Sequence, residues 1–143
     1  MSIQVPFEFN RNEQCVIVSP DFLSLTEAKV DSDNFIESGH FIDVDGNLCT
    51  IEKTPKWHAL VTEANFYKSA GGKVLKPAGN VVGYFGDIRF ITKLFTDDAD
   101  NPIAKGDLLT LVDGKPAKLD DNHTIPVIQV IHRASDYIEC VTI

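Results

Sequence analysis

The sequence contains no apolar run close to the roughly 20 residues that a membrane-spanning helix needs. Its first residues also lack the basic stretch and apolar core of a signal peptide. We therefore expect a soluble, intracellular product with no membrane partner. Basic residues are scarce as well: 13 Lys and Arg stand against 21 Asp and Glu, for a formal net charge of −8. This average charge would repel a phosphate backbone, so we expect no nucleic-acid partner.

Cysteine is also rare. The chain has three cysteines, Cys15, Cys49 and Cys140, which lie far apart in the sequence. An odd number at wide spacing is not typical of a disulfide framework or of a zinc site. We therefore expect free thiols, buried or half-buried, in a reducing compartment.

No catalytic set is recognisable in the sequence. A nucleophilic triad needs a Ser or Cys against a His, and no His lies in a G-x-S-x-G elbow. No two histidines have the i, i+4 spacing of a helical metal pair. The histidines are His40, His58, His123 and His132. We predict no catalytic residues, no metal site and no cofactor, and a chain that is not an enzyme.

Two acidic stretches have some of the residues of a calcium loop. "DVDGN" (43–47) lacks the remaining ligands and the terminal Glu of an EF-hand. "TDDADN" (96–101) has several carboxylates but no defined spacing, and a solvated acidic loop is the favoured interpretation. A weak calcium site at Asp97–Asp100 is left open.

The sequence does contain many short apolar runs separated by Gly, Pro and Asp-Gly turns, a pattern typical of β-proteins. We predict a mainly β fold, an antiparallel barrel-like or sandwich-like domain with at most one or two short helices. One helix is expected over 22–29, with Asp21 as its cap. Gly46 and Gly114 are expected at positive φ in hairpin turns. Strands are expected at 15–18, 40–44, 47–51, 59–62, 81–85, 89–95, 107–112, 115–119, 126–133 and 137–143.

Residues 1–14 are predicted to form an extended N-terminal arm. The apolar residues Ile3, Val5, Phe7 and Phe9 alternate, so an extended segment would present them on one face. They are our candidates for a partner interface, and an arm that completes the domain's own sheet is the alternative. Trp57, the only tryptophan, is a further candidate, either as an interface anchor or packed over the core.

Residues 15–143 are expected to form a single β-rich domain, with two small lobes, about 15–79 and 80–143, as an alternative. A faint internal similarity is one that two lobes of related construction would produce. "ESGHFIDVDGNL" (37–48) and "AKGDLLTLVDGKP" (104–116) share a Gly, an apolar run and an Asp-Gly turn. Each is followed by a polar loop and a second apolar run. Because Asp-Gly hairpins are common, chance is the favoured explanation of this similarity.

Residues 81–143, and more loosely residues 35–65, resemble the head decoration, or cement, proteins of tailed bacteriophages. The resemblance rests on "VVGYFGDIRFITKLFTDD" (81–98), "PIAKGDLLTLVDGKPAKL" (102–119) and "PVIQVIHRASDYIECVTI" (126–143). In that class a Gly-Asp entry, an apolar strand, an Asp-Gly turn, a polar loop and a Pro-led strand precede the final strand. Gln129 departs from the pattern, because such sequences often have Gly there.

The resemblance implies a non-enzymatic virion protein, made in the host cytoplasm, that binds the outer surface of the capsid and stabilises it. Its partner would be the major capsid protein lattice, and it would act as a homo-oligomer, with a trimer favoured. Two alternatives stay open: another tail or baseplate structural component, or a small β-barrel domain with a ligand-binding or enzymatic site built from loops.

Overall fold

A computed structural model of the chain describes residues 14–19, 25–29, 39–61, 67–68, 74–75, 80–84 and 87–143. The described residues contain strands and turns but no helix. The strands are β1 (Cys15–Ser19), β2 (Leu25–Lys29), β3 (Phe41–Ile42), β4 (Ala59–Val61), β5 (Tyr67–Lys68), β6 (Val74–Leu75), β7 (Asn80–Tyr84), β8 (Arg89–Thr92), β9 (Leu108–Val112), β10 (Lys115–Lys118), β11 (Ile128–Arg133) and β12 (Ile138–Thr142).

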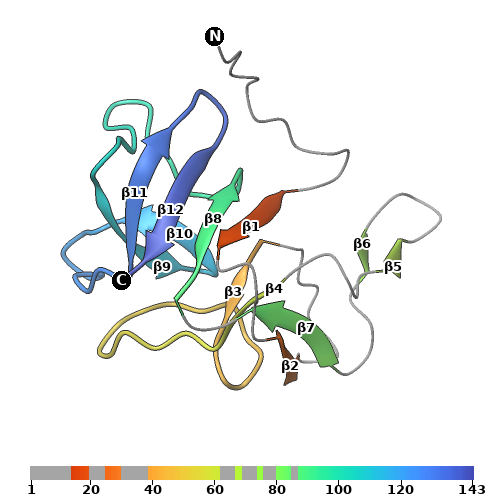
Figure 1. Cartoon of the computed structure of the whole chain (residues 1–143). Helices are drawn as coiled ribbons and strands as arrows, with labels where there is room; N and C mark the ends of the chain where they lie inside the picture. The colour runs from red at the N-terminus through yellow and green to blue at the C-terminus, as the bar shows by residue number, and fades with distance from the viewer. Residues whose placement is uncertain are drawn as a thin grey trace, which may run out of the picture.

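The strands form three sheets, and every strand pair is antiparallel (Figure 1). A six-stranded sheet has the order β1-β8-β12-β11-β9-β10, and a four-stranded sheet has the order β2-β7-β4-β3. Strands β5 and β6 form a small separate pair. The predicted class, a mainly antiparallel β fold, is confirmed. Residues 1–13 of the predicted arm lie outside the described residues.

The helix predicted over 22–29 is wrong for the residues that the structure describes. Leu25–Lys29 is strand β2, whose five residues pair with β7 from Leu25↔Tyr84 to Lys29↔Asn80. A weak helical pattern is readily overridden when a neighbouring strand offers a full set of backbone partners. Residues 21–24, with the expected cap, lie outside the described residues.

Both predicted Asp-Gly turns are present. At the β9–β10 turn, Asp113 (φ 51°) and Gly114 (φ 80°) both have left-handed backbone conformations, as the type I′ turn of a two-residue hairpin requires. Gly46 (φ 84°) lies in the turn after β3, where the Asp43 carboxylate accepts the N–H groups of Asp45 and Asn47.

The two larger sheets contain the same four-strand unit twice. Repeat 1 (residues 25–84) consists of β2, β3, β4 and β7, and repeat 2 (residues 89–142) consists of β8, β9, β11 and β12. In each unit the first strand pairs with the fourth, the fourth with the third, and the third with the second. β1 precedes repeat 1 but pairs with β8 of repeat 2.

The strand register is also the same in the two repeats. One row across repeat 1 is Leu25–Tyr84–Leu60–Phe41, and the matching row across repeat 2 is Arg89–Val141–Gln129–Leu108. Agreement at every pairing favours a duplicated unit over a chance similarity. The lobe division at 79 stays a prediction, although β7 (Asn80–Tyr84) pairs with strands of repeat 1.

Backbone hydrogen bonds at the entry to the second strand repeat as well. Gly39 N–H donates to the Val61 carbonyl at 2.8 Å, and Gly106 N–H donates to the Val130 carbonyl at 2.8 Å. The two glycines have φ values of 92° and 93°. A left-handed residue before each second strand therefore turns the chain into the sheet in the same way.

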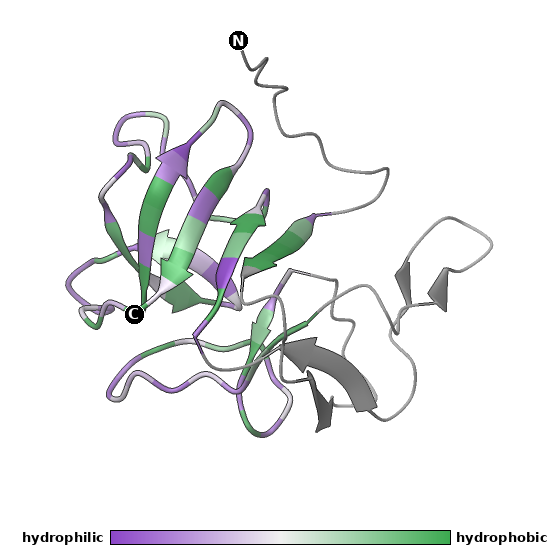
Figure 2. Cartoon of the chain, viewed as in Figure 1, coloured by the Kyte–Doolittle hydropathy of each residue, from purple (hydrophilic) through white to green (hydrophobic). Residues whose placement is uncertain are grey.

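The main core lies between the two repeats. Phe41 and Leu60 of repeat 1 belong to one buried cluster with the core-facing residues of repeat 2, among them Phe90 and Leu109. Ile42 and Ala59 are also fully buried but lie outside this cluster, as expected for residues that point to the opposite face of repeat 1. Figure 2 shows apolar and polar residues in alternation along β11 and β12, which have one face in the core.

Candidate functional site

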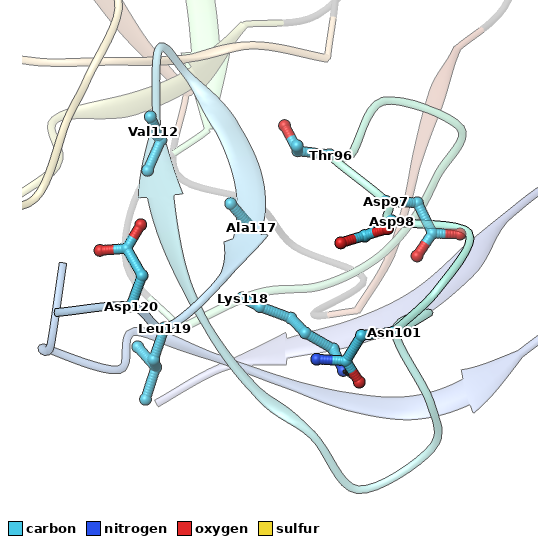
Figure 3. A pocket seen from close by; sticks show the side chains of 9 residues that line it. All are labelled: Thr96, Asp97, Asp98, Asn101, Val112, Ala117, Lys118, Leu119 and Asp120. Atoms are coloured by element: carbon cyan, nitrogen blue, oxygen red, sulfur yellow. Dashed lines mark hydrogen bonds between the residues drawn. The ribbon is translucent and has the colours of Figure 1, made fainter. Parts of the chain in front are cut away.

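A hollow of about 280 Å³ lies between the acidic loop that follows β8 and the β9–β10 hairpin (Figure 3). Its lining residues are Thr96, Asp97, Asp98, Asn101, Val112, Ala117, Lys118, Leu119 and Asp120. The loop side is polar, and the hairpin side combines three apolar residues with the charged Lys118 and Asp120. The hollow is therefore the first candidate for a small-molecule site among the described residues.

Two contacts of Asp97 hold the acidic loop in place. Its Oδ1 accepts the Ile103 N–H at 2.8 Å, and its Oδ2 accepts a guanidinium N–H of Arg133 at 3.1 Å. The Ile103 hydrogen bond lowers the pKa of Asp97 below its ordinary value, desolvation opposes it, and the charge and hydrogen bond of Arg133 lower the pKa further. The Arg133 guanidinium also lies 4.9 Å from the centre of the Phe95 ring.

Lys118 supplies the positive charge of the hollow. Its Nζ donates to Asn101 Oδ1 at 2.8 Å and lies 3.7 Å from Asp107 Oδ2. Figure 3 shows the Asn101 and Lys118 side chains meeting at one wall. The opposite wall holds Asp120, whose carboxylate accepts the N–H groups of Asn122 and His123.

Two carboxylates of the hollow, those of Asp97 and Asp120, remain charged at neutral pH and do not transfer protons. Desolvation raises the pKa of Asp120, but the hydrogen bonds from Asn122 and His123 outweigh it and lower that pKa. Asp97 and Asp120 are therefore ionised at neutral pH, and neither can serve as a general acid there. The hollow can accept a small polar or cationic group.

The acidic loop does not form a metal cluster in the structure. The described residues contain no group of three or more His, Cys, Asp or Glu side chains that could hold a metal ion. Besides the contacts of Asp97, Asp98 Oδ1 accepts the Asp100 N–H at 3.0 Å, so these carboxylates stabilise the loop's own backbone. Within the described ranges, no helix is long and apolar enough to cross a membrane.

No disulfide joins Cys15, Cys49 and Cys140, and Cys49 and Cys140 are buried. Burial, followed by the charge of Asp43, raises the pKa of Cys49 to about 11. Burial likewise raises the pKa of Cys140 far above its usual range. Because the thiolate is the nucleophile, neither thiol is reactive at neutral pH.

Trp57 is half-buried beside the core. Its ring meets the ring of Phe41 edge-on at a centroid distance of 5.0 Å. This contact is the one expected of a tryptophan that packs over the core, and the exposed part of the ring leaves the interface hypothesis open. The other interface candidates, Ile3, Val5, Phe7 and Phe9, lie outside the described residues, and their role stays a prediction.

A second surface was not predicted from the sequence. Leu108, Gln129 and Val141 are aligned on neighbouring strands β9, β11 and β12, on the face of repeat 2 opposite to the core. We name the set of Leu108, Gln129, Val141 and the flanking Leu119 and Ile143 the outer row. Leu108 is 43% exposed, Leu119 38% and Ile143 59%.

The register explains why Leu119 belongs to the outer row. Lys118 pairs with Leu109, so the next position, Leu119, falls opposite Leu108. Ile143 follows the end of β12 and is 59% exposed, and its N–H donates to the Val127 carbonyl at 2.9 Å. The sequence signal was the unbroken apolar run at 108–109, which places a leucine on each face of β9.

Comparisons of the chain with protein-family models, with curated protein sequences and with solved structures gave no match. The functional argument therefore rests on the residues and their geometry.

Proposed function

We propose that the chain is a structural protein of a tailed-bacteriophage virion that binds the outer surface of the capsid and stabilises it. The observation that supports this most is the order of elements in the last third of the chain. A Gly106-Asp107 entry leads into β9, the Asp113-Gly114 turn leads into β10, and an exposed polar loop precedes Pro126, β11 and β12. This is the order on which the resemblance to decoration proteins rests.

The departure at Gln129 is compatible with the proposal. Gln129 is half-buried and pairs with Leu108 on one side and Val141 on the other. The strand therefore accommodates a side chain where decoration-protein sequences often have Gly.

The chemistry of the described residues also supports a binding role. The buried thiols are protonated at neutral pH, and Asp97 and Asp120, the carboxylates with lowered pKa values, are ionised and accept backbone N–H groups of their own loops. The proposed partner is the major capsid protein lattice, and the proposed state is a homo-oligomer, with a trimer favoured. Ile3, Val5, Phe7, Phe9 and Trp57 remain the proposed contact residues.

Locating the chain in the virion tests the proposal. Antibodies against the purified chain, with gold-labelled secondary antibodies, would be applied to virions of the phage that encodes it. Labelling over the whole head is expected. Labelling confined to the tail or baseplate would replace decoration with the other structural role. Virions free of the chain would overturn both. Particles that lack the chain are expected to release DNA at a lower temperature, and added chain should restore their stability.

A second candidate function, binding of a small ligand, rests on the hollow beside the acidic loop. Its volume of about 280 Å³ is near the lower limit for a small-molecule pocket. A cationic ligand with hydrogen-bond donors would suit Asp97, Asp98 and Asp120. Titration calorimetry with arginine amide and spermidine tests this function. Saturable binding that Asp98→Asn weakens would support it, and no heat at millimolar ligand would reject it.

A further inference from the structure

The chain contains two Asp-Gly pairs, and both stand in the same tripeptide. Val44-Asp45-Gly46 lies in the turn after β3, and Val112-Asp113-Gly114 spans the β9–β10 turn. Asp-Gly is the pair most open to isomerisation, because glycine has no side chain to shield its amide nitrogen from the aspartate carboxyl group. The local sequence gives both sites nearly the same intrinsic reactivity, so a difference between them comes from the fold.

The isomerisation needs only water besides the chain itself. The glycine amide nitrogen attacks the aspartate Cγ, and the carboxyl OH leaves with the amide proton as water, which gives a five-membered succinimide. Addition of water at Cγ restores aspartate. Addition at the backbone carbonyl carbon gives isoaspartate, in which the main chain runs through Cβ and Cγ. Because the attack requires the Asp-Gly peptide to rotate out of its turn geometry, its rate depends on how often the turn opens.

Repeat 1 holds the turn at Asp113 and Gly114 closed. The Gly114 N–H donates to the Cys49 carbonyl at 2.8 Å, and the Gly114 carbonyl accepts the Phe41 N–H at 2.8 Å. The Asp113 N–H donates to Thr50 Oγ1 at 3.0 Å. Opening this turn therefore breaks three hydrogen bonds between the repeats, and it requires the repeats to separate locally.

The turn at Asp45 and Gly46 is held by its own residues. Among the described residues, its hydrogen bonds join only positions 43–47. The Gly46 N–H donates to the Asp43 carbonyl at 3.1 Å, and the Asp43 carboxylate accepts the N–H groups of Asp45 and Asn47. Asp45 is exposed, and Val44 before it is 74% exposed. This turn can open while the two repeats stay in contact.

We propose that Asp45 is a modification site at which the folded chain forms isoaspartate, and that the same tripeptide at Asp113 is protected by the contact between the repeats. This inference does not depend on the proposed function. The product carries a free α-carboxylate on an exposed turn, which is the group that repair methyltransferases methylate. The methyl group passes from S-adenosylmethionine to a carboxylate oxygen and leaves S-adenosylhomocysteine, and the ester returns to the succinimide with loss of methanol.

Ageing of the purified full-length chain tests the inference. The wild type and Asp45→Glu would be kept folded at neutral pH and physiological temperature for several weeks, and the wild type would also be kept in concentrated guanidinium chloride. Glutamate is the matched control, because its longer side chain would have to close a six-membered ring, which forms much more slowly. Far-ultraviolet circular dichroism would verify that both proteins stay folded.

Two measurements would follow isoaspartate in these samples. A purified isoaspartyl methyltransferase with radiolabelled S-adenosylmethionine counts the methyl-accepting groups. Digestion with endoproteinase Asp-N, which does not cleave before isoaspartate, followed by mass spectrometry identifies the modified position. In the folded wild type, Asp45 is expected to isomerise at least about 10-fold faster than Asp113, and Asp45→Glu should lose most of the methyl-accepting groups. In denaturant the two aspartates should react at similar rates.

Three results would overturn the inference. If the folded chain gains no isoaspartate at Asp45 over the time in which the denatured chain reacts, Asp45 is not a modification site. If Asp113 reacts as fast as Asp45 in the folded chain, the contact between the repeats does not protect it. If isoaspartate forms at Asp45 but the enzyme does not methylate it, the modified turn is not a substrate.

Discussion

The ring of Phe41 on β3 meets the ring of Phe90 on β8 at a centroid distance of 5.5 Å and an interplanar angle of 65°. The contact joins repeat 1 to repeat 2 at the centre of the core. Edge-to-face aromatic pairs add to the stability that burial alone supplies. Phe41 also contacts Trp57, so its ring is part of a three-ring cluster.

Truncation of Phe41 should therefore weaken the contact between the two repeats and lower the stability of the fold. Phe41→Ala is expected to cost about 3–5 kcal/mol, and Phe41→Leu about 1–2 kcal/mol, because a fully buried ring is replaced by a cavity of different size. Urea unfolding followed by circular dichroism measures both. Val44→Ala, at an exposed position, should change stability by less than about 0.5 kcal/mol. A cost for Phe41→Ala no larger than this control would contradict the contact.

Gly114 and Gly106 provide a matched pair of glycines. Both have positive φ, but a Cβ on Gly114 would lie 2.9 Å from the Phe41 carbonyl oxygen, and a Cβ on Gly106 meets nothing within 4 Å. Gly106→Ala should cost about 1–2 kcal/mol for the backbone conformation alone. Gly114→Ala should cost at least about 1 kcal/mol more, and Gly114→Val more again. Equal unfolding free energies for the two alanine variants would show that the hairpin is misplaced.

Trp57 is expected to contribute to stability through its ring contact. Trp57→Ala should lower the free energy of unfolding by about 2 kcal/mol, less than for a fully buried aromatic, because the ring is half-exposed. The Trp57→Phe variant should retain most of the stability that the Trp57 ring contributes. If Trp57→Ala leaves stability unchanged but abolishes capsid binding, the interface hypothesis is correct and the core hypothesis fails.

Asp97 should make stability depend on pH. Its pKa is lowered in the folded state, so its contribution is fully present above the unfolded value of about 3.9. The contribution is lost as the pH falls through the folded pKa. Asp97→Asn is expected to cost up to about 1 kcal/mol at pH 7, because the ion pair with Arg133 is partly exposed.

Urea unfolding at pH 7 and at strongly acidic pH measures this dependence. The difference in unfolding free energy between the wild type and Asp97→Asn should shrink in acid. Asp121→Asn, an exposed substitution in the next polar loop, is the control and should stay within about 0.5 kcal/mol. A difference for Asp97→Asn that persists unchanged in acid would mean that its charge does not hold the loop.

Thiol reactivity should separate the cysteines. At pH 8 a disulfide reagent such as 5,5′-dithiobis(2-nitrobenzoic acid) should modify Cys15, which is partly exposed, well before Cys49 or Cys140. The pKa of about 11 for Cys49 leaves on the order of one thiolate in a thousand at that pH. In denaturant all three should react at once. Rapid reaction of two thiols in the folded protein would contradict the burial.

Local signals predicted much of this fold. The Asp-Gly pairs at 45–46 and 113–114 marked both turns, because few residue types adopt the left-handed backbone conformation that such turns require. Apolar runs located β4, β9 and β11 to within two residues. The similarity between 37–48 and 104–116 indicated the repeat, since one Gly and one Asp-Gly turn occupy comparable places in both units.

The long-range arrangement could not be predicted in the same way. Leu25–Lys29 has no strong strand pattern, and its conformation depends on β7, more than 50 residues away. The outer row was missed because a leucine on either face of β9 has the same sequence signal, and only the stacking of the repeats decides which is exposed. The hollow depends on Asp97 and Lys118 being brought together from separate segments.

The pairing of β1 with β8 has a consequence for synthesis. Cys15 and Thr92 are partners separated by more than half of the chain. At ribosomal rates of about 5–20 residues per second, the apolar β1 segment therefore waits roughly 4–15 s for its partner to be made. Such non-local antiparallel pairs close slowly, and folding on the order of milliseconds to seconds after release is expected. Among the described strand pairs this wait is the longest, so the apolar "CVIV" segment at 15–18 stays unpaired for that time during translation.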